Sequence, residues 1–338
     1  MNNRGSKVAY WTGGADAGST LVATERDLAA EPDYENFFRL QGKASGNYMS
    51  SNIYSGSQMA MTADANDANT IFYITSKNRL LSYTKGTYTN GTHSIGTVGG
   101  ANAEAVDFRP SQSGNEGYYT LYTNYSGSKY VYDNNNRVDR NGGYAATNCE
   151  WQVTKVESLP VSIGSTGYTT LYTPVALSLP EGVKAYTAVR NDEYIDLVAI
   201  ETGVIPANTA VILKGNSGTH YFAITESTES IKNNVLQGTI EKTATSSISN
   251  PYTLQSDNTA DNGVVMRRYN GEYINGFKVY MSLDNAQETL YFNFGGATGI
   301  EETKSQAENG AVYDLFGRRI EGEPTNGVYI TNGEKFIK

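Results

Sequence analysis

Apolar and polar positions alternate in short runs along most of this chain, and turn-forming residues separate the runs. Examples are residues 38–40, 71–74 and 119–121 in the first half, and residues 194–200 and 289–294 in the second. A period of two within a short run predicts a β-strand, and a turn about every eight to twelve residues is typical of sandwiches and barrels. The pattern therefore predicts an all-β protein.

The first half contains an imperfect internal repeat. An aromatic-x-Leu run followed by Ser-Gly occurs at residues 38–46 and again at residues 119–127, an offset of 81, with a weaker copy between them. The aromatic residues Phe72, Phe108 and Trp151 close the three units and stand 36 and 43 residues apart. One such unit cannot bury its apolar face alone, whereas three units around a pseudo-threefold axis close a barrel capped by hairpins.

Three units of this kind resemble a β-trefoil of the ricin-type lectin kind. The likeness departs from the QxW pattern of that family, because only Trp151 is a tryptophan and Gln152 follows it. The resemblance implies a trefoil-like domain over residues 31–156, with the three closing aromatics around a common centre. We expect residues 1–30 to be the remnant of a truncated upstream module plus a linker.

The second half has a different texture from Leu159 onwards. Short apolar runs at roughly regular spacing predict an antiparallel β-sandwich over residues 157–297. The stretch around residues 172–186 is also similar to a module found before the C-terminal region of Bacteroidetes surface proteins. Residues 298–338 are expected to hold a polar linker and a short C-terminal β-hairpin or strand module.

The last forty residues contain two strand-like runs and end on an apolar pair between lysines. They resemble the C-terminal (type IX-like) sorting region of secreted Bacteroidetes proteins. An ordinary hairpin that finishes the sandwich is the alternative interpretation. The residues that carry the likeness are Tyr313, Asp314, Leu315, Gly317, Arg318, Arg319, Gly327, Tyr329, Lys335 and Lys338.

If the sorting resemblance holds, the export machinery is a partner and the protein is secreted or lies on the cell surface, outside the outer membrane. Met1 to Gly5 lack the apolar core of a signal peptide, so we expect a fragment whose upstream residues are missing.

Composition narrows the range of partners. The chain has 338 residues, 38% hydrophobic and 18% charged, with 26 Tyr and 35 Gly. A formal charge of −9 argues against nucleic acid or an anionic membrane as a partner. No run of eighteen apolar residues exists, so the sequence predicts no membrane span. A single cysteine, Cys149, excludes an internal disulfide.

The sequence offers little for catalysis. A nucleophile needs a base beside it, and the two histidines, His93 and His220, both lie next to turn signals. Cys149 has neither histidine nearby in sequence and reads as a small buried residue. Paired carboxylates for glycoside hydrolysis remain open among 35 acids. We predict that the chain is not an enzyme and that any catalytic domain would lie upstream of Met1.

Metal sites have similarly weak support. Residues 64–69 and 133–141 are rich in Asp and Asn, but the first loop lacks EF-hand spacing. Solvated turns are the prediction for both, with weak Ca²⁺ binding left open. Zinc needs His and Cys clusters that this sequence lacks. No metal or cofactor is predicted.

The lectin resemblance implies a sugar site, with an early Asp, an aromatic and a late Asn in each unit. Only the third unit has all three, as Asp133, Tyr144 and Asn148. An aromatic ring stacks on a pyranose while a carboxylate or amide bonds its hydroxyls. The predicted function is non-catalytic binding of a glycan or polysaccharide. The alternatives are spacer or presentation modules without a ligand, or the C-terminal part of a glycoside hydrolase or peptidase.

Overall fold

The regular structure of the chain consists of strands and short turns. The computed structural model describes residues 2–4, 7–9, 36–55, 58–75, 79–90, 97–98, 106–123, 129–141, 143–191, 194–284, 287–293, 312–314, 320, 328–331 and 334–337. Within them the only helical pieces are two 3₁₀ turns, η3 (Ala68–Thr70) and η4 (Thr245–Ser247). The all-β prediction is confirmed.

Strands between residues 38 and 155 form one 12-stranded sheet, in three successive sets of four. The middle two strands of each set pair with each other. In the first and third sets the outer two strands also pair with each other. The strands are β3 (Phe38–Gly42), β4 (Tyr48–Ser55), β5 (Gln58–Thr62), β6 (Phe72–Ile74), β7 (Leu80–Ser82), β8 (Thr87–Asn90), β9 (Thr97–Val98), β10 (Val106–Pro110), β11 (Tyr118–Thr123), β12 (Lys129–Asn134), β13 (Arg137–Asn141) and β14 (Glu150–Lys155).

The last strand of the third set closes the barrel onto the first strand of the first set. Strand β14 pairs with both β11 and β3, so that Trp151 stands opposite Tyr119 on one side and Gly42 on the other. Strands β6 and β7 join the first set to the second, and β10 and β11 join the second set to the third. This threefold connectivity is that of a β-trefoil.

The three closing aromatics lie in one core. Phe72, Phe108 and Trp151 belong to the same buried cluster, in which the rings of Phe38 and Phe108 are 5.8 Å apart. The indole Nε1 of Trp151 donates a hydrogen bond to the carbonyl oxygen of Val131 at 3.2 Å, which satisfies its polar edge. The prediction of a common centre is confirmed, although two of the three units use Phe where the lectin pattern has Trp.

The second half folds into two main sheets and one small one. A 4-stranded sheet has the order β15-β22-β17-β20, and a 9-stranded sheet has the order β16-β21-β18-β19-β29-β26-β25-β28-β23. Their strands are β15 (Ser158–Ile163), β16 (Tyr168–Leu171), β17 (Ala176–Ser178), β18 (Lys184–Arg190), β19 (Tyr194–Ala199), β20 (Val204–Ile205), β21 (Val211–Lys214), β22 (Gly218–Thr225), β23 (Leu236–Thr239), β25 (Pro251–Ser256), β26 (Val264–Arg268), β28 (Lys278–Ser282) and β29 (Thr289–Asn293), with β24 (Thr243–Ala244) paired to β27 (Tyr273–Ile274).

Strand β21 separates two cores. Val211 and Leu213 face one buried cluster and Ile212 faces another, so the strand is buried on both sides. A strand of this kind reads as a continuous apolar run rather than as an alternation. One pairing differs from an antiparallel sandwich, because β19 and β29 run parallel.

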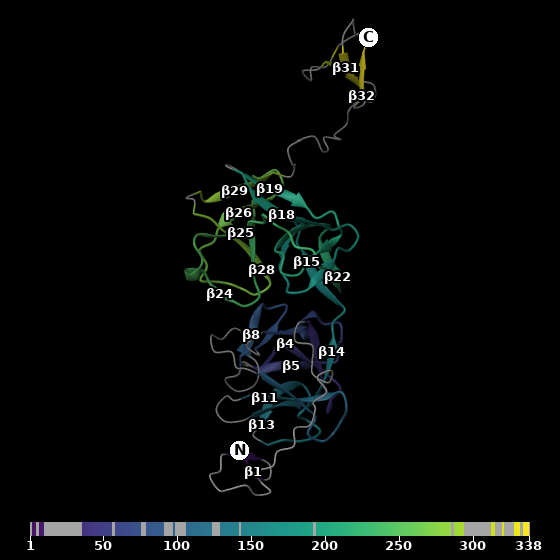
Figure 1. Cartoon of the computed structure of the whole chain (residues 1–338), viewed down its shortest axis with the longest axis vertical. Helices are drawn as coiled ribbons and strands as arrows, with labels where there is room; N and C mark the ends of the chain where they lie inside the picture. The colour runs from purple at the N-terminus through teal and green to yellow at the C-terminus, as the bar shows by residue number, and fades with distance from the viewer. Residues whose placement is uncertain are drawn as a thin grey trace.

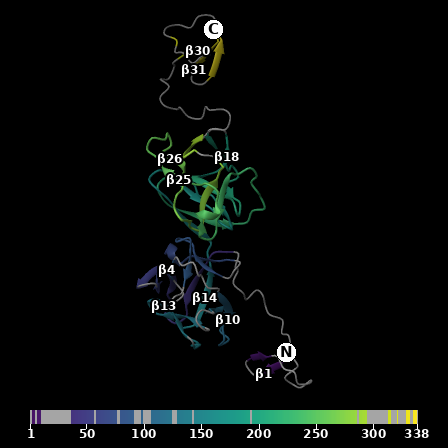
Figure 2. The same cartoon turned by 90° about the vertical axis from the view of Figure 1, so that its left-hand side faces the viewer.

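Figures 1 and 2 show the trefoil strands in purple to teal and the sandwich strands above them in teal to green. Near the ends of the chain, β1 (Asn2–Arg4) pairs with β2 (Lys7–Ala9), and β30 (Val312–Asp314), β31 (Val328–Thr331) and β32 (Glu334–Ile337) form a small sheet. The residue limits given above for the four domains stay predictions.

Candidate functional site

An aromatic cluster joins the trefoil to the sandwich. Phe277, which precedes β28, packs among Phe37, Tyr73 and Tyr83 of the trefoil, with ring centroids 5.5, 6.3 and 5.5 Å from its own. The buried hydroxyl of Tyr83 donates a hydrogen bond to the carbonyl oxygen of Pro160 at 3.1 Å. The two halves therefore share one apolar core at their junction.

Two glycines bring the backbones of the halves into direct contact. The amide nitrogen of Gly276 donates to the carbonyl oxygen of Gly86 at 2.7 Å. A Cβ atom on Gly86 would stand 2.4 Å from the carbonyl oxygen of Gly276. A Cβ atom on Gly276 would stand 2.2 Å from the carbonyl oxygen of Ile240. Gly86 also has a φ of +59°, which favours glycine. This close approach fixes how the sandwich sits on the trefoil.

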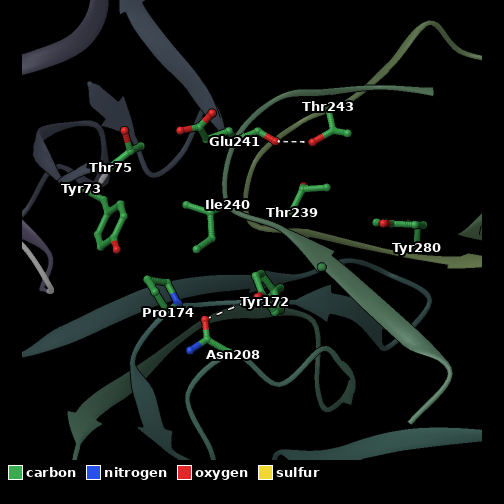
Figure 3. Close-up of a pocket in the computed structure, with 11 residues that line it drawn as sticks. Tyr73, Thr75, Tyr172, Pro174, Asn208, Thr239, Ile240, Glu241, Thr243 and Tyr280 are labelled. Carbon is green, nitrogen blue, oxygen red and sulfur yellow. Dashed lines mark hydrogen bonds between the residues drawn. The ribbon is translucent and has the colours of Figure 1, made fainter. Parts of the chain in front are cut away.

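A pocket of about 730 Å³ lies beside this junction, and Figure 3 shows its lining. Its volume falls within the usual range for small-ligand sites, which favour boundaries between domains. Strand β6 and the residue that follows it contribute Tyr73 and Thr75. The sandwich contributes Tyr172, Pro174, Asn208, Gly238, Thr239, Ile240, Glu241, Thr243 and Tyr280.

The ring of Tyr172 packs directly against the backbone of β23. A Cβ atom on Gly238 would lie 1.9 Å from the ring of Tyr172, so the ring rests directly on this glycine. The hydroxyl of Tyr172 donates to the Oδ1 atom of Asn208 at 3.4 Å. Asn208 adopts a φ of +57°, a conformation that Asn tolerates better than most residues. A left-handed turn thus places an amide beside a phenol at the pocket.

Both sandwich phenols of the pocket are neutral at ordinary pH. Burial raises the pKa of Tyr172, with a further contribution from Tyr280, and burial also raises the pKa of Tyr280. Each hydroxyl therefore keeps its proton and can donate as well as accept a hydrogen bond. Among the lining residues that the structure describes, Glu241 supplies one carboxylate.

Sequence analysis missed this pocket. Tyr73, Tyr172 and Tyr280 lie far apart along the chain and meet only when the two halves pack together. One local signal exists, because Tyr73 alternates with the buried Phe72 and Ile74 and must face away from the barrel core. Nothing in the sequence says what that outer face meets.

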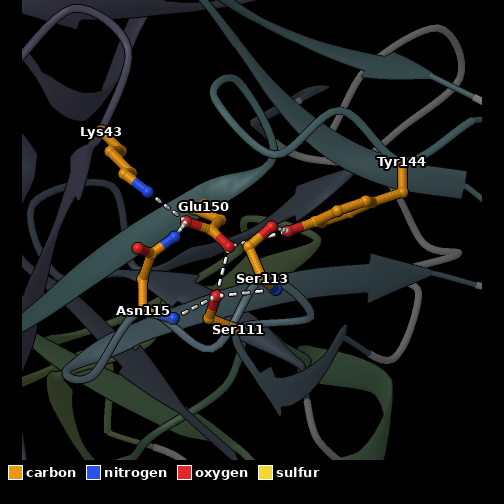
Figure 4. Close-up of polar contacts among 6 residues, drawn as sticks. All are labelled: Lys43, Ser111, Ser113, Asn115, Tyr144 and Glu150. Atoms are coloured by element: carbon orange, nitrogen blue, oxygen red, sulfur yellow. Dashed lines mark hydrogen bonds and ion pairs between the residues drawn. The ribbon is translucent and has the colours of Figure 1, made fainter.

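A second polar cluster surrounds Glu150 at the start of β14, as Figure 4 shows. Lys43 Nζ lies 2.7 Å from the Oε2 atom, which also accepts from Asn115 Nδ2 at 2.6 Å. The Oε1 atom accepts from the Tyr144 hydroxyl at 2.7 Å and from the Ser111 hydroxyl. The carboxylate is completely buried, and groups from three separate loops converge on it.

The balance of burial and hydrogen bonding decides the charge of Glu150. Burial alone would raise its pKa, but hydrogen bonds from Lys43, Ser111, Tyr144 and Asn115 outweigh it and hold the pKa at about 2. A carboxylate that is always ionised and already accepts four hydrogen bonds is unsuited to proton transfer. Its hydrogen bonds link β14 of the third unit to Lys43 of the first unit and to the loop that holds Ser111 and Asn115. This indicates a structural role.

The predicted sugar residues of the third unit take structural contacts. Asp133 is 0% exposed, and its carboxylate accepts hydrogen bonds from the backbone and hydroxyl of Ser45 and from the amide of Asn135. Asn148 lies beside it and donates to its backbone oxygen at 2.9 Å. Tyr144 turns instead toward Glu150.

The assignment of Asp133 to sugar contact is therefore corrected. A carboxylate without exposed surface does not reach a ligand, and its charge organises the turn between β12 and β13. Asp-x-Asn at a hairpin turn is a typical Asx signal, which was available in the sequence. Tyr144 and Asn148 are partly exposed, and their contact with sugar stays a prediction.

The C-terminal motif is described only in part. Tyr313 and Asp314 lie in β30, Tyr329 lies in β31 and is buried, and Lys335 lies in β32 and is exposed. The remaining motif residues, Leu315, Gly317, Arg318, Arg319, Gly327 and Lys338, lie outside the described residues. The sorting role stays a prediction.

Other candidates show ordinary structural roles. Cys149 is buried, and burial raises the pKa of its thiol. His220 lies in strand β22 rather than in a turn, while His93 lies outside the described residues. Asp64 and Asp67 each accept a hydrogen bond from the backbone amide two residues later. Across the described ranges no three His, Cys, Asp or Glu gather as a metal site, and no helix is both long and apolar enough to cross a membrane.

Comparison with known proteins finds structural neighbours but no named family. No protein-family model and no curated protein matches the chain. The crystal structure of a designed threefold-symmetric protein, ThreeFoil, is similar at 15% identity with a TM-score of 0.28, covering 36% of this chain and 99% of that one. The crystal structure of Cry35Ab1 is similar at 9% identity with a TM-score of 0.29, covering 74% of this chain and 88% of that one.

Proposed function

We propose that this chain is a non-catalytic, carbohydrate-binding region of a secreted or cell-surface protein. The glycan occupies the pocket between the trefoil and the sandwich, with Tyr73, Tyr172 and Tyr280 around it. The observation that carries the proposal is the gathering of three tyrosines, one amide and one carboxylate around a cavity of about 730 Å³.

The chemistry of the lining suits a polyhydroxylated ligand. Tyrosine has an apolar ring that can stack on the C–H face of a pyranose and a hydroxyl that can form hydrogen bonds with the sugar hydroxyls. Asn208, Glu241 and the hydroxyl of Thr243 add acceptors and donors in the same cavity. A site that mixes rings with a few placed polar groups is the usual composition of a small-ligand pocket.

The charge of the chain favours a neutral glycan. The formal charge is −9, and Glu241 adds a carboxylate to the pocket itself. An acidic saccharide would be repelled both by the net negative charge of the chain and by the carboxylate of Glu241. Hydroxyl groups, in contrast, donate well to a carboxylate, and such charge-assisted bonds are the stronger kind.

A structural role without ligand is the second candidate. The direct backbone contact between Gly86 and Gly276 makes a stiff junction, which a spacer that presents another module would also need. A spacer does not need an open cavity lined by three tyrosines. The experiment below separates the two roles.

A glycan array on the full chain, followed by calorimetric titration of the best ligand, tests the proposal. We expect Tyr280→Ala to weaken binding by about tenfold, because one stacked ring is worth roughly 1.4 kcal/mol. Tyr280→Phe, which keeps the ring and loses the hydroxyl, should weaken it less. Tyr221→Ala is the matched control, since Tyr221 is exposed and lies on β22 outside the pocket.

The outcomes separate cleanly when folding is measured in parallel. Loss of binding in Tyr280→Ala with an unchanged melting temperature supports the pocket. If no glycan binds, or if the Tyr280 and Tyr221 variants bind equally well, the spacer role replaces it. Asp133→Ala is expected to lower the melting temperature instead, because Asp133 is a buried turn residue.

We also propose that residues 298–338 direct export, with the machinery reading the motif around Tyr313 and Tyr329. The support is the sequence resemblance together with the pairing of β30, β31 and β32 into a sheet of their own. Fusion of residues 298–338 to a periplasmic reporter in a Bacteroidetes host tests it. Reporter on the cell surface is the expected result, and retention in the periplasm would remove the proposal.

A further inference from the structure

Two tyrosines stand side by side on the outer face of the sandwich. Tyr194 on β19 and Tyr291 on β29 are register partners in the parallel strand pair, and they are 48% and 45% exposed. Neighbouring strands lie about 4.8 Å apart, and paired residues share a face. The next residues, Ile195 and Phe292, turn toward the core. The two rings therefore form one exposed surface.

A polar pair follows immediately along the same strands. Asp196 and Asn293 are the next outward register partners, and Asn293 Nδ2 donates to Asp196 Oδ1 at 3.0 Å. Asn191 Nδ2 donates to the other oxygen at 3.2 Å. A carboxylate has about four acceptor positions, so these bonds orient Asp196 and leave it capacity to accept more. We call Tyr194, Tyr291, Asp196 and Asn293 the tyrosine platform.

We propose that the tyrosine platform binds an extended, neutral polysaccharide on the outside of the sandwich. Two sugar rings stack on Tyr194 and Tyr291, and hydroxyls of the chain donate to Asp196 and exchange hydrogen bonds with the amide of Asn293. The platform shares no residue with the pocket at the trefoil junction. This proposal therefore stands independently of the pocket's function.

The polar pair identifies the occupant as a sugar chain rather than an apolar protein surface. A protein that covered the platform with apolar side chains would desolvate Asp196 without pairing its charge, which is costly. Hydroxyl-rich polymers satisfy the same oxygens while they cover the rings.

Charge excludes acidic polymers from the platform. Asp192 and Glu193 directly precede Tyr194 in the sequence, and Asp196 follows it on the same face. These residues and the overall charge of −9 repel uronic acid polymers and nucleic acids. Neutral hexose and pentose polymers remain.

Affinity electrophoresis of the full chain through gels that contain soluble β-glucan, xylan, mannan or starch tests the proposal. At least one polymer should retard the wild-type chain. We expect the double variant Tyr194→Ala/Tyr291→Ala to lower the association constant at least about tenfold, and Asp196→Asn to lower it about threefold. Tyr221→Ala, at a still more exposed tyrosine on β22, should leave retardation unchanged.

The pocket variant Tyr280→Ala distinguishes the platform from the pocket. It should reduce polymer retardation less than the double variant does, because Tyr280 lines the other site. If the double variant, with its melting temperature unchanged, is retarded like the wild type, the platform proposal is overturned. It is equally overturned if none of the four polymers retards the chain. A dimer in the wild type that the double variant loses would identify a second copy of the chain as the occupant instead.

Discussion

The Glu150 cluster and the pocket at the trefoil junction contain nearly the same chemistry with opposite exposure. Each combines a glutamate, at least one tyrosine hydroxyl, an amide and a small hydroxyl, and the Glu150 cluster adds Lys43. At Glu150 every acceptor position of the carboxylate is used by the protein, and no surface remains open. Around Glu241 the same residue types border a cavity. Access to solvent, rather than residue type, separates a structural polar cluster from a candidate binding site.

The largest expected loss of unfolding free energy comes from removing the buried carboxylate of Glu150. Glu150→Ala should lower the free energy of unfolding by about 3–5 kcal/mol, because it leaves Lys43 and three further donors without their buried partner. Urea denaturation of variant and wild type measures this. Glu181→Gln, at an exposed turn, is the control and should change little. A loss below about 1 kcal/mol at Glu150 would contradict the proposed structural role.

Acid should reproduce part of that loss without mutation. The pKa of Glu150 is depressed to about 2, below its unfolded value of about 4.3. Its contribution is therefore complete above the unfolded pKa and disappears as the pH falls from about 4 toward 2. A depression of this size corresponds to about 3 kcal/mol. Denaturation curves between pH 7 and pH 2 should show the gap between wild type and Glu150→Gln narrowing at low pH; a constant gap would contradict the assignment.

A smaller loss of unfolding free energy is expected at Gly238, whose backbone lies against the ring of Tyr172 in the pocket. Gly238→Ala places a methyl group 1.9 Å from the ring of Tyr172, so the ring must move off its seat. We expect a loss of about 1–3 kcal/mol in unfolding free energy, the usual cost of overpacking, together with weaker glycan binding. Gly164→Ala is the matched control, because nothing lies within 4 Å of a Cβ atom there. Unchanged binding in Gly238→Ala would show that Tyr172 does not shape the site.

The smallest expected effect on the free energy of unfolding is at Glu241, which borders the pocket. Glu241→Gln should change the free energy of unfolding by no more than about 0.5 kcal/mol, since its carboxylate borders a cavity rather than a filled core. Titration of the best array ligand should show affinity reduced severalfold. If Glu241→Gln proves as destabilising as Glu150→Ala, the two clusters are alike and the pocket is structural.

Sequence reasoning reached the trefoil because its information is local and repeated. The offset of 81 residues between the first and third units, and the closing positions of Phe72, Phe108 and Trp151, match the strand sets of the structure. Position 151 mattered more than the identity of its side chain, because Phe fills the same place in the other two units.

The candidate site could not be reached in the same way. Asp133 carried the right residue type for a sugar contact, but burial is a property of the folded chain and reversed its role. Tyr73, Tyr172 and Tyr280 come together through a contact between two halves that alternation within each strand does not encode. The parallel pairing of Tyr194 with Tyr291 is equally non-local. One local signal of the second half is the unbroken apolar run of Val211, Ile212 and Leu213, which the structure buries on both faces of β21.

The hydrogen bond between Gly276 and Gly86 has a consequence for long ligands. Because backbone meets backbone there, the trefoil and the sandwich are held at one mutual orientation, and the distance from pocket to platform is constant. A polymer that spans both sites would experience a high effective concentration at the second after engaging the first. Oligomers too short for that span would bind each site singly, so avidity should rise abruptly at one chain length.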